Sequence, residues 1–200
     1  MPDSLERLLA LTALILVSPL MLIIAIAIFI CSPGNPLFRA IRIGRNGEPF
    51  GMWKFRTMVQ DASTIGPPIT GNRDPRVIPS GQFLRRSKLD ELPQFLNVVL
   101  GDMSLIGPRP ESPEIVKLYT AEQRQVLAFK PGMTGKVQLD TGDESLKIPA
   151  GAQADDFYVE HLMRGKLASD LEYMRNRTLL SDIKILFSTA GYVFRIIARG

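Results

Sequence analysis

The sequence is poor in the residues that usually bind transition metals or form disulfides. It contains one cysteine, Cys31, and one histidine, His161, among its 200 residues. A lone cysteine excludes an intrachain disulfide and a thiolate zinc site, and a lone histidine excludes a site built from several histidines. A metal used by this protein should therefore be a hard cation bound through carboxylate and phosphate oxygens, and Mg²⁺ is the first candidate.

Charged side chains are absent from residues 8–38, and residues 8–31 are almost purely aliphatic. As a helix that rises about 1.5 Å per residue, such a run reaches roughly 30 Å, the thickness of one hydrocarbon core. The run therefore predicts a membrane helix. A secretory signal peptide is the alternative, but its apolar part would be long, and Arg7 is the only basic residue before it, beside Asp3 and Glu6.

A proline interrupts this run near its middle, at Ser18-Pro19. Proline removes one backbone hydrogen bond and should bend the helix, and the Ser18 hydroxyl is the nearest candidate partner for the disturbed backbone. Neither half alone is long enough to span a bilayer. The residues leave two outcomes open: a bent helix that crosses the bilayer, or a re-entrant helix that leaves by the leaflet it entered.

Basic residues follow the apolar run closely, and they are Arg39, Arg42, Arg45, Lys54 and Arg56. The positive-inside rule places this part of the chain in the cytoplasm. The net charge of +4 also suits an anionic partner such as phospholipid or nucleotide. We therefore predict a membrane anchor in residues 1–38 and a cytoplasmic catalytic domain in residues 39–200.

The pattern after the anchor predicts an α/β fold that is mostly helical with one small hairpin. The segment PLFRAIRIGRNGEPFGMWKFRTM, residues 36–58, alternates apolar and polar residues around Asn46-Gly47, a strong hairpin signal. We expect a loop at 60–81, a turn leading into a short strand in KPGMTGKVQL at residues 130–139, and helices at 83–88, 94–100, 113–129, 153–165 and 167–175. The last segment, 179–199, is either a core helix or an amphipathic helix in the lipid interface.

Two carboxylates, Asp90 and Glu91, lie side by side shortly before a proline, in the stretch SKLDELPQFLNVVLGDMSLIGPRP of residues 87–110. The simple explanation is a capping box, in which Ser87 starts a helix and Asp90 reaches back to it. That explanation uses only one of the two acids. It also leaves no role for the arginine of the stiff GPRP loop or for the nearby basic residues, which are Arg85, Arg86 and Lys88.

Phosphoryl transfer accounts for these groups together. A carboxylate such as Asp90 can attack phosphorus and form an acyl phosphate, which divides one displacement into two steps. The phosphoryl oxygens then require Mg²⁺, arginines and free backbone amides. A glycosidase fits poorly, because its two carboxylates face each other across a sugar, whereas adjacent helical residues point about 100° apart. A general-base role for either acid stays open.

The stretch LDELPQFLNVVLGDMSLIGPRP, residues 89–110, closely resembles the signature of the bacterial sugar transferases, the monotopic polyprenyl-phosphate phosphoglycosyl transferases. KFRTM at 54–58, PGMTG at 131–135 and SDIKILFST at 181–189 match in the same order, as does the membrane segment with its central Ser-Pro. The resemblance covers nearly the whole chain, in the size of the minimal members with a single catalytic domain.

This resemblance implies an Mg²⁺-dependent enzyme that transfers a sugar phosphate from a UDP-sugar to a polyprenyl phosphate of the undecaprenyl type. The reaction would pass through a covalent phosphosugar enzyme, release UMP first, and give a polyprenyl diphosphate-linked sugar, the start of glycoconjugate and polysaccharide assembly. It would take place at the bacterial inner membrane, with the catalytic domain facing the cytoplasm and interfacial helices at the lipid. No nucleic-acid partner is expected.

The resemblance also assigns residues by position. Asp90 matches the nucleophile and is the candidate Mg²⁺ ligand, and Glu91 matches its dyad partner, which either orients Asp90 or shares the metal. The candidate phosphate ligands are Arg85, Arg109, Lys54 and Arg56. Ser18 and Pro19 match the break that makes the membrane helix re-entrant. Lys136 and residues 139–152 depart from the family pattern, and Asp170, Tyr173 and Asp182 are interpreted first as structural.

Two other functions compete with this one. A non-enzymatic membrane module would bind anionic lipid or nucleic acid through the basic residues after the anchor, but it leaves Asp90, Glu91 and the GPRP loop without a role. A membrane-bound phosphatase would form an aspartyl phosphate and hydrolyse it without a lipid acceptor.

Overall fold

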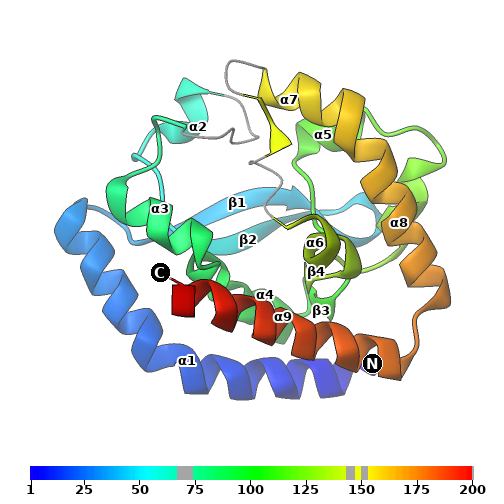
Figure 1. The fold of residues 1–200 in the computed structure, drawn as a ribbon, viewed down its shortest axis with the longest axis horizontal. Coiled ribbons are helices and arrows are strands. Elements are labelled where there is room, and N and C mark those ends of the chain that lie inside the picture. Colours follow the sequence, from blue (N-terminus) through cyan, green and yellow to red (C-terminus); the bar gives the residue numbers. More distant parts are fainter. Residues whose placement is uncertain (67–73, 143–146, 150–152, 200) are drawn as a thin grey trace.

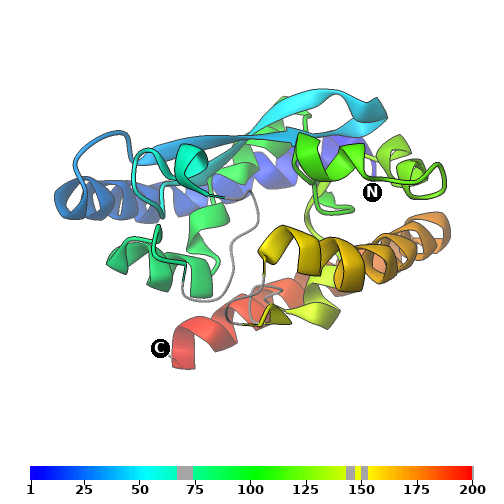
Figure 2. The same ribbon diagram turned by 90° about the horizontal axis from the view of Figure 1, so that it is seen from above.

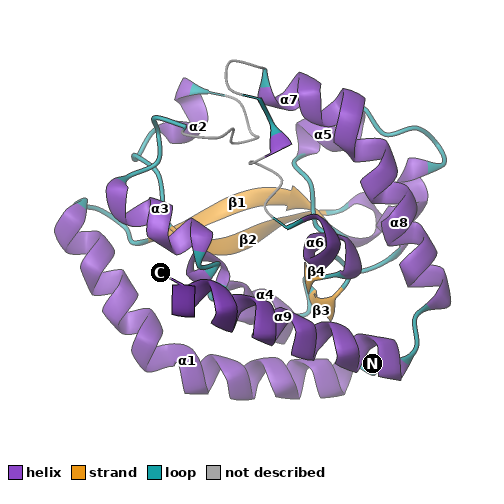
Figure 3. Cartoon of the chain, viewed as in Figure 1, coloured by secondary structure: helices purple, strands orange, loops and turns teal. Residues whose placement is uncertain are grey.

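The computed structural model describes residues 1–66, 74–142, 147–149 and 153–199. Helices make up most of the fold and surround two small sheets (Figure 3). The first sheet is the antiparallel hairpin of β1 (Leu37–Ile43) and β2 (Pro49–Phe55), with Leu37 opposite Phe55. Its turn, η1 (Arg45–Gly47), places Asn46 and Gly47 at φ values of 59° and 84°. The hairpin prediction is confirmed, because these are the left-handed conformations that Asn-Gly favours.

Helix α1 (Asp3–Cys31) contains the predicted membrane segment. It is long and apolar enough to cross a membrane, and only 11% of its most apolar 18-residue window is buried inside the protein. A core helix would bury far more. Pro19 lies inside the helix, the Ser18 hydroxyl donates to the carbonyl of Ile15 at 2.8 Å, and the ribbon of α1 changes direction along its length (Figure 1).

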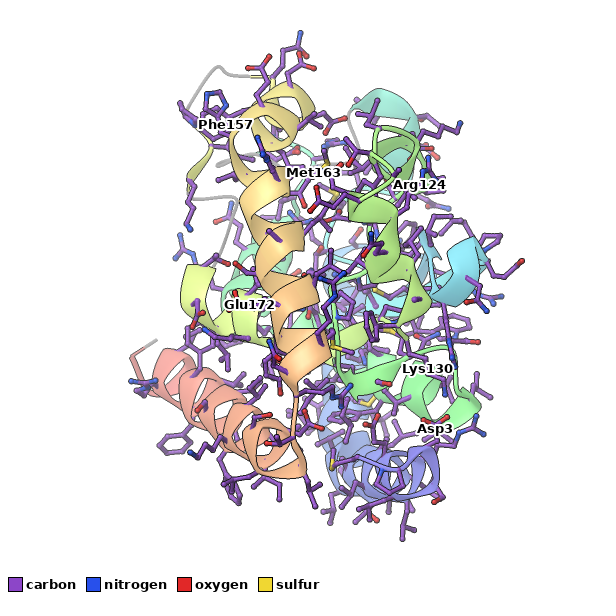
Figure 4. The ribbon with its side chains drawn as sticks, turned by 90° about the vertical axis from the view of Figure 1, so that its right-hand side faces the viewer. Asp3, Arg124, Lys130, Phe157, Met163 and Glu172 are labelled. Carbon is purple, nitrogen blue, oxygen red and sulfur yellow. The ribbon has the colours of Figure 1, made fainter. Side chains whose placement is uncertain are left out.

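The rest of the folded chain holds both ends of α1. Near its start, Glu6 accepts a buried hydrogen bond from the backbone N–H of Leu105 at 3.1 Å. Near its end, Ile24 and Ile28 pack in a cluster with Phe55 and Leu84. Lys130 also forms an ion pair with Asp3, and Figure 4 shows the two residues close together. The two ends of α1 are therefore attached to one and the same folded unit.

The second sheet joins β3 (Ser104–Ile106) to β4 (Gly132–Thr134) in parallel, with Ser104 opposite Gly132 and Ile106 opposite Thr134. The short strand predicted in KPGMTGKVQL is confirmed, and it lies within the PGMTG motif. The end of that stretch belongs to helix α6 (Lys136–Thr141).

The helices before β3 are short: α2 (Ala62–Ile65), α3 (Pro79–Arg86) and α4 (Gln94–Leu100). The end of α4 at Gly101, with φ at 95°, is as predicted. The long loop expected at 60–81 is broken by α2 and by the start of α3, and its residues 67–73 fall outside the described residues, as do 143–146 and 150–152 of the segment that departs from the family pattern.

The single helix predicted for residues 113–129 is wrong. The structure has α5 (Pro113–Lys117), begun by Ser112 as predicted, and then the separate 3₁₀ helix η3 (Gln123–Ala128). Thr120 and Gln123 explain the break: each side chain accepts a hydrogen bond from the backbone N–H of the other, at 3.3 and 2.8 Å. This reciprocal pair is a capping box, which starts a new helical segment.

The two helices expected at 153–165 and 167–175 form one continuous helical stretch. It consists of α7 (Ala154–Phe157), the π-helical turn η5 (Tyr158–Leu162) and α8 (Met163–Asn176), and Figure 4 shows it running past Met163 and Glu172. The last helix is α9 (Leu179–Arg199). Figure 2 shows α9 and the β1–β2 hairpin on opposite sides of the molecule.

Helix α9 has two different faces. On the inner face, Ile185 joins the main core cluster with Met52, Val98 and Ile106. Asp182 is also buried, and it accepts hydrogen bonds from Tyr173 and Arg177, both at 2.7 Å, which agrees with the structural interpretation of Tyr173 and Asp182. The outer face exposes large apolar side chains, which are Leu179, Leu180, Phe187 and Phe194.

Candidate active site

The acid pair lies on a short turn of 3₁₀ helix, η2 (Leu89–Glu91), which follows α3 after a sharp reversal at Lys88 with φ of 58°. Ser87 does not start this turn. Its hydroxyl donates back to the carbonyl of Phe83 at 2.8 Å, so it closes α3 instead. The capping-box explanation for Ser87 and Asp90 is therefore wrong, and the conformation of Lys88, uncommon for a residue with a side chain, turns Asp90 toward the interior.

Asp90 is buried, with 5% of the residue exposed. In the described part of the chain, no donor reaches its Oδ1 atom, which is also buried. Burial raises the pKa of Asp90, Lys54 opposes this shift, and the charge of Glu91 adds to it. The ionised form of Asp90 is therefore less stable than that of an ordinary surface aspartate.

Glu91 has the opposite surroundings. It accepts hydrogen bonds from Lys54 at 3.1 Å and from two nitrogens of Arg109, of which Nη1 lies 3.3 Å from Oε2. Burial works against ionisation of this side chain, but Arg109 and Lys54 hold the pKa of Glu91 well below its ordinary value. Two adjacent carboxylates in such different surroundings can take different chemical roles.

The remaining predicted phosphate ligands lie in two places. Arg85 donates to the Thr57 hydroxyl at 3.1 Å, and its charge acts on Asp90, so it belongs to the site. Arg56 donates to the carbonyls of Ser32 and Pro33 at the end of α1. The structure brings Lys54, Arg85 and Arg109 to the acid pair, whereas the guanidinium of Arg56 binds the backbone just after the end of α1.

The loop that carries Arg109 is fixed by a close approach of two glycines. The N–H of Gly107 donates to Thr134 at 3.0 Å, and the N–H of Gly132 donates to Pro108 at 2.9 Å. A Cβ atom at Gly132 would lie 2.0 Å from the backbone nitrogen of Gly107. The glycines of GPRP and PGMTG therefore allow the two motifs to pack backbone against backbone, which sets the position of Arg109.

Gly132→Ala should consequently destabilise the fold by about 1–3 kcal/mol and lower activity by displacing the Arg109 loop. The measurement is the denaturant midpoint in detergent together with the turnover rate. Gly165→Ala is the matched control, because nothing lies within 4 Å of its added Cβ and alanine favours the helix α8. A Gly132→Ala protein as stable as the control would contradict this explanation.

Glu111, directly after the GPRP loop, anchors it to α8. It accepts hydrogen bonds from Lys166 at 2.8 Å and from the Tyr158 hydroxyl. Burial opposes its ionisation, but Lys166 and Tyr158 hold the pKa of Glu111 below its ordinary value of 4.5. Because the pKa is lower in the folded state, this group stabilises the fold above pH 4.5 and loses its contribution as the pH falls through the lowered value.

Glu111→Gln should therefore lower the free energy of unfolding at pH 7 by about 1–3 kcal/mol, because it weakens bonds to a buried ammonium group. The difference from the unchanged protein should shrink as the pH is lowered below 4.5, and urea unfolding across pH 3–7 measures it. Exposed Glu160 provides the control Glu160→Gln, which should show little effect at any pH. A constant difference across this range would contradict the role of ionised Glu111.

Two fully buried polar residues that follow the acid pair, Gln94 and Asn97, were not predicted from the sequence. Gln94 is fully buried, and within the described chain neither its Nε2 nor its Oε1 has a hydrogen-bond partner. Asn97, also fully buried, donates to the carbonyl of Gly51 at 2.8 Å and accepts from the N–H of Trp53 at 2.9 Å. Their spacing from Asp90, four and seven residues, is that of one face of a helix and was the available signal, although η2 and α4 are separate helices.

Comparison with known proteins places this site in a family. The bacterial sugar transferase family matches residues 2–196. The chain is 38% identical over 195 residues to the UDP-glucose:undecaprenyl-phosphate glucose-1-phosphate transferase of Escherichia coli K12, covering 92% of this chain and 39% of that protein. It is 36% identical over 187 residues to the exopolysaccharide production protein PSS of Rhizobium leguminosarum bv. phaseoli, covering 90% and 88%.

A third relative is the UDP-N-acetylgalactosamine-undecaprenyl-phosphate N-acetylgalactosaminephosphotransferase of Aeromonas hydrophila, 37% identical over 191 residues, which cover 93% of this chain and 42% of that protein. The chain thus spans about two fifths of the length of the E. coli and Aeromonas relatives and most of the length of PSS. With the acid pair, the GPRP loop and the PGMTG strand assembled in one place, the chain belongs to the bacterial sugar transferase family.

Proposed function

We propose that this protein transfers a sugar phosphate from a UDP-sugar to an undecaprenyl-type polyprenyl phosphate and releases UMP. The names of the relatives from E. coli and Aeromonas support the donor and acceptor classes. The observation that carries the proposal is the pair of adjacent carboxylates, of which Glu91 is held ionised by Lys54 and Arg109 and the buried Asp90 has no donor at Oδ1 within the described residues.

The reaction has two displacements at one phosphorus. An ionised oxygen of Asp90 attacks the phosphorus that carries the sugar, and the bond from this phosphorus to the oxygen of UMP breaks, so UMP leaves. A phosphate oxygen of the lipid then attacks the same phosphorus, the bond to Asp90 breaks, and the carboxylate is restored. The weakly stabilised carboxylate of Asp90 suits the attacking role, and the cations around Glu91 suit binding of the phosphoryl oxygens.

Mg²⁺ fits these residues. It is usually bound by one or two carboxylates together with substrate phosphates, and Asp90 offers a buried carboxylate oxygen that accepts no hydrogen bond from the described residues. When bound, Mg²⁺ supplies positive charge for the diphosphate. Glu91, as the next residue, either shares the metal or orients Asp90.

The attachment of both ends of α1 to one folded unit supports a re-entrant anchor. A helix that crossed the whole bilayer would place its ends on opposite sides, yet Glu6 near the start and Ile28 near the end both contact the same domain. The exposed apolar faces of α1 and α9 suit burial in lipid, with α9 at the interface. We place the domain on the cytoplasmic side of the bacterial inner membrane, where the active site meets the lipid phosphate at headgroup depth.

One assay tests this proposal against its competitors: UMP release from a panel of UDP-sugars, with and without polyprenyl phosphate and with and without Mg²⁺. With Mg²⁺ and the right donor but no lipid, the transferase should release no more than about one UMP per enzyme as the adduct forms. Continued UMP release and formation of the lipid-linked sugar should require polyprenyl phosphate as well. A phosphatase would hydrolyse its substrate without the lipid. A non-enzymatic module would release no UMP and would bind anionic partners in a steeply salt-dependent manner.

A further inference from the structure

We propose that Arg42 binds the phosphate that leaves with UMP, a role that rests on the proposed function and adds a residue to it. Arg42 lies in β1, opposite Phe50 of β2. The starting observation is that no described residue gives its guanidinium a hydrogen bond or ion pair, although the side chain is only partly exposed. Burying a charge without a partner is costly, so such a cation is expected where a ligand supplies the anion.

The register of the hairpin places Arg42 and Lys54 on the same face. Side chains alternate along a strand, so Arg42 shares a face with Ala40, and Lys54 shares one with Met52, while Ala40 and Met52 are paired across the hairpin. Both Ala40 and Met52 are buried in the main core cluster, so this face is the inner one. Lys54, opposite Phe38 at the open end of the hairpin, donates to Glu91. Arg42 lies on the same face but at the other end, next to the hairpin turn.

The end of that face next to the hairpin turn meets the GPRP loop. The N–H of Ile43 donates to the carbonyl of Glu111 at 2.9 Å, which joins the end of β1 to the loop. Burial lowers the pKa of Arg42, Glu111 and the exposed Glu114 oppose the shift, and Arg109 adds to it. Arg42 is therefore an electrostatic neighbour of Arg109, and Glu111 is already engaged by Lys166 and Tyr158.

This arrangement gives the cations an order. Lys54 and Arg109 bind Glu91 beside the nucleophile, and Arg42 lies at the other end of the hairpin face from Lys54, where β1 meets Glu111 of the GPRP loop. A diphosphate presents two anionic groups in a row, and an in-line attack by Asp90 places the leaving phosphate on the side away from the nucleophile. The phosphate of UMP would then meet Arg42, whose planar guanidinium can bind two phosphate oxygens at once.

The test uses the full chain in detergent and measures the affinity for UMP in the presence of Mg²⁺, together with KM for the UDP-sugar and for polyprenyl phosphate. Arg42→Gln should weaken UMP binding and raise the donor KM by about 10- to 100-fold, as expected for a lost charged hydrogen bond, with the lipid KM unchanged. For Arg42→Lys, the UMP affinity and the donor KM should lie between those of the unchanged protein and those of Arg42→Gln. Arg39→Gln is the matched control, because Arg39 is on the same strand but on the other face, over the ring of Trp53.

Three outcomes overturn the inference. These are unchanged UMP affinity in Arg42→Gln, a raised KM for the lipid phosphate in place of the donor, and an equal loss in Arg39→Gln. A structural role is separated by thermal unfolding: removal of an unpaired cation should leave the midpoint unchanged or higher, whereas a structural arginine would lower it with UMP affinity intact. If the unchanged protein releases no UMP from any donor, the proposed function itself fails; if it does and Arg42→Gln behaves identically, only the role of Arg42 fails.

Discussion

Asp90→Asn is expected to abolish the covalent phosphosugar adduct and to lower UMP release by on the order of 10⁴-fold or more, as for other deleted nucleophiles. An asparagine has nearly the same shape, so the loss would be one of chemistry and not of packing. Incubation with a UDP-sugar in the absence of lipid acceptor should trap the adduct on the unchanged protein, and intact-mass spectrometry measures it. An adduct that still forms on the asparagine variant would move the nucleophile to another residue.

Stability gives this variant an independent check. Because the pKa of Asp90 is raised by burial, its ionised form opposes folding at neutral pH, and a neutral side chain should keep or raise the unfolding midpoint. Asp3→Asn is the control, since Asp3 is largely exposed in a surface ion pair with Lys130 and should change neither activity nor stability appreciably. If Asp90→Asn is inactive and unfolded, misfolding explains the loss of activity. If it is inactive but folded and stable, the loss is due to the missing carboxylate oxygen of Asp90.

Local signals in the sequence were enough for the elements that are stabilised locally. Asn46-Gly47 has few conformations other than the hairpin turn, and Gly101 ends α4 through its own left-handed conformation. Thr120 and Gln123 carried an equally local signal for a helix start, but the apolar pattern across residues 113–129 concealed it. At Ser87 a local signal was present but misleading, because a serine hydroxyl can bond to the helix before it as readily as to the helix after it.

The geometry of the site depends on contacts that are distant in the sequence. Lys54 and Glu91 are 37 residues apart, and Glu111 and Lys166 are 55 residues apart. No periodicity links such pairs, so a resemblance to a family was needed to associate Lys54 with the acids, whereas Arg109 was suggested by its place on the GPRP loop of the same stretch. The same resemblance grouped Arg56 with them, whereas its side chain is bound to Ser32 and Pro33, which only the packing of α1 determines.

Glu91→Gln is expected to lower turnover by about 10²–10³-fold, as for the loss of a preorganised charged group, while a slowly formed adduct on Asp90 persists. It should also destabilise the fold by roughly 3–5 kcal/mol, because it leaves Lys54 and Arg109 without their shared anion. The two variants should therefore behave in opposite ways. Asp90→Asn should be stable but form no adduct, whereas Glu91→Gln should be destabilised but still form the adduct. Adduct kinetics and denaturant unfolding measure both.

The double variant Glu91→Gln with Lys54→Met separates stability from chemistry. Removing the Lys54 ammonium, which has lost its anionic partner, should restore much of the lost stability because no unpaired buried charge remains. It should not restore turnover, because the Glu91 carboxylate is still missing. The Mg²⁺ dependence of Glu91→Gln then distinguishes its two roles. A higher Mg²⁺ requirement indicates that Glu91 shares the metal, and an unchanged one indicates that it orients Asp90. Full turnover in Glu91→Gln would contradict the dyad, because Arg109 and Lys54 would then hold their positions without the anion that they both bind.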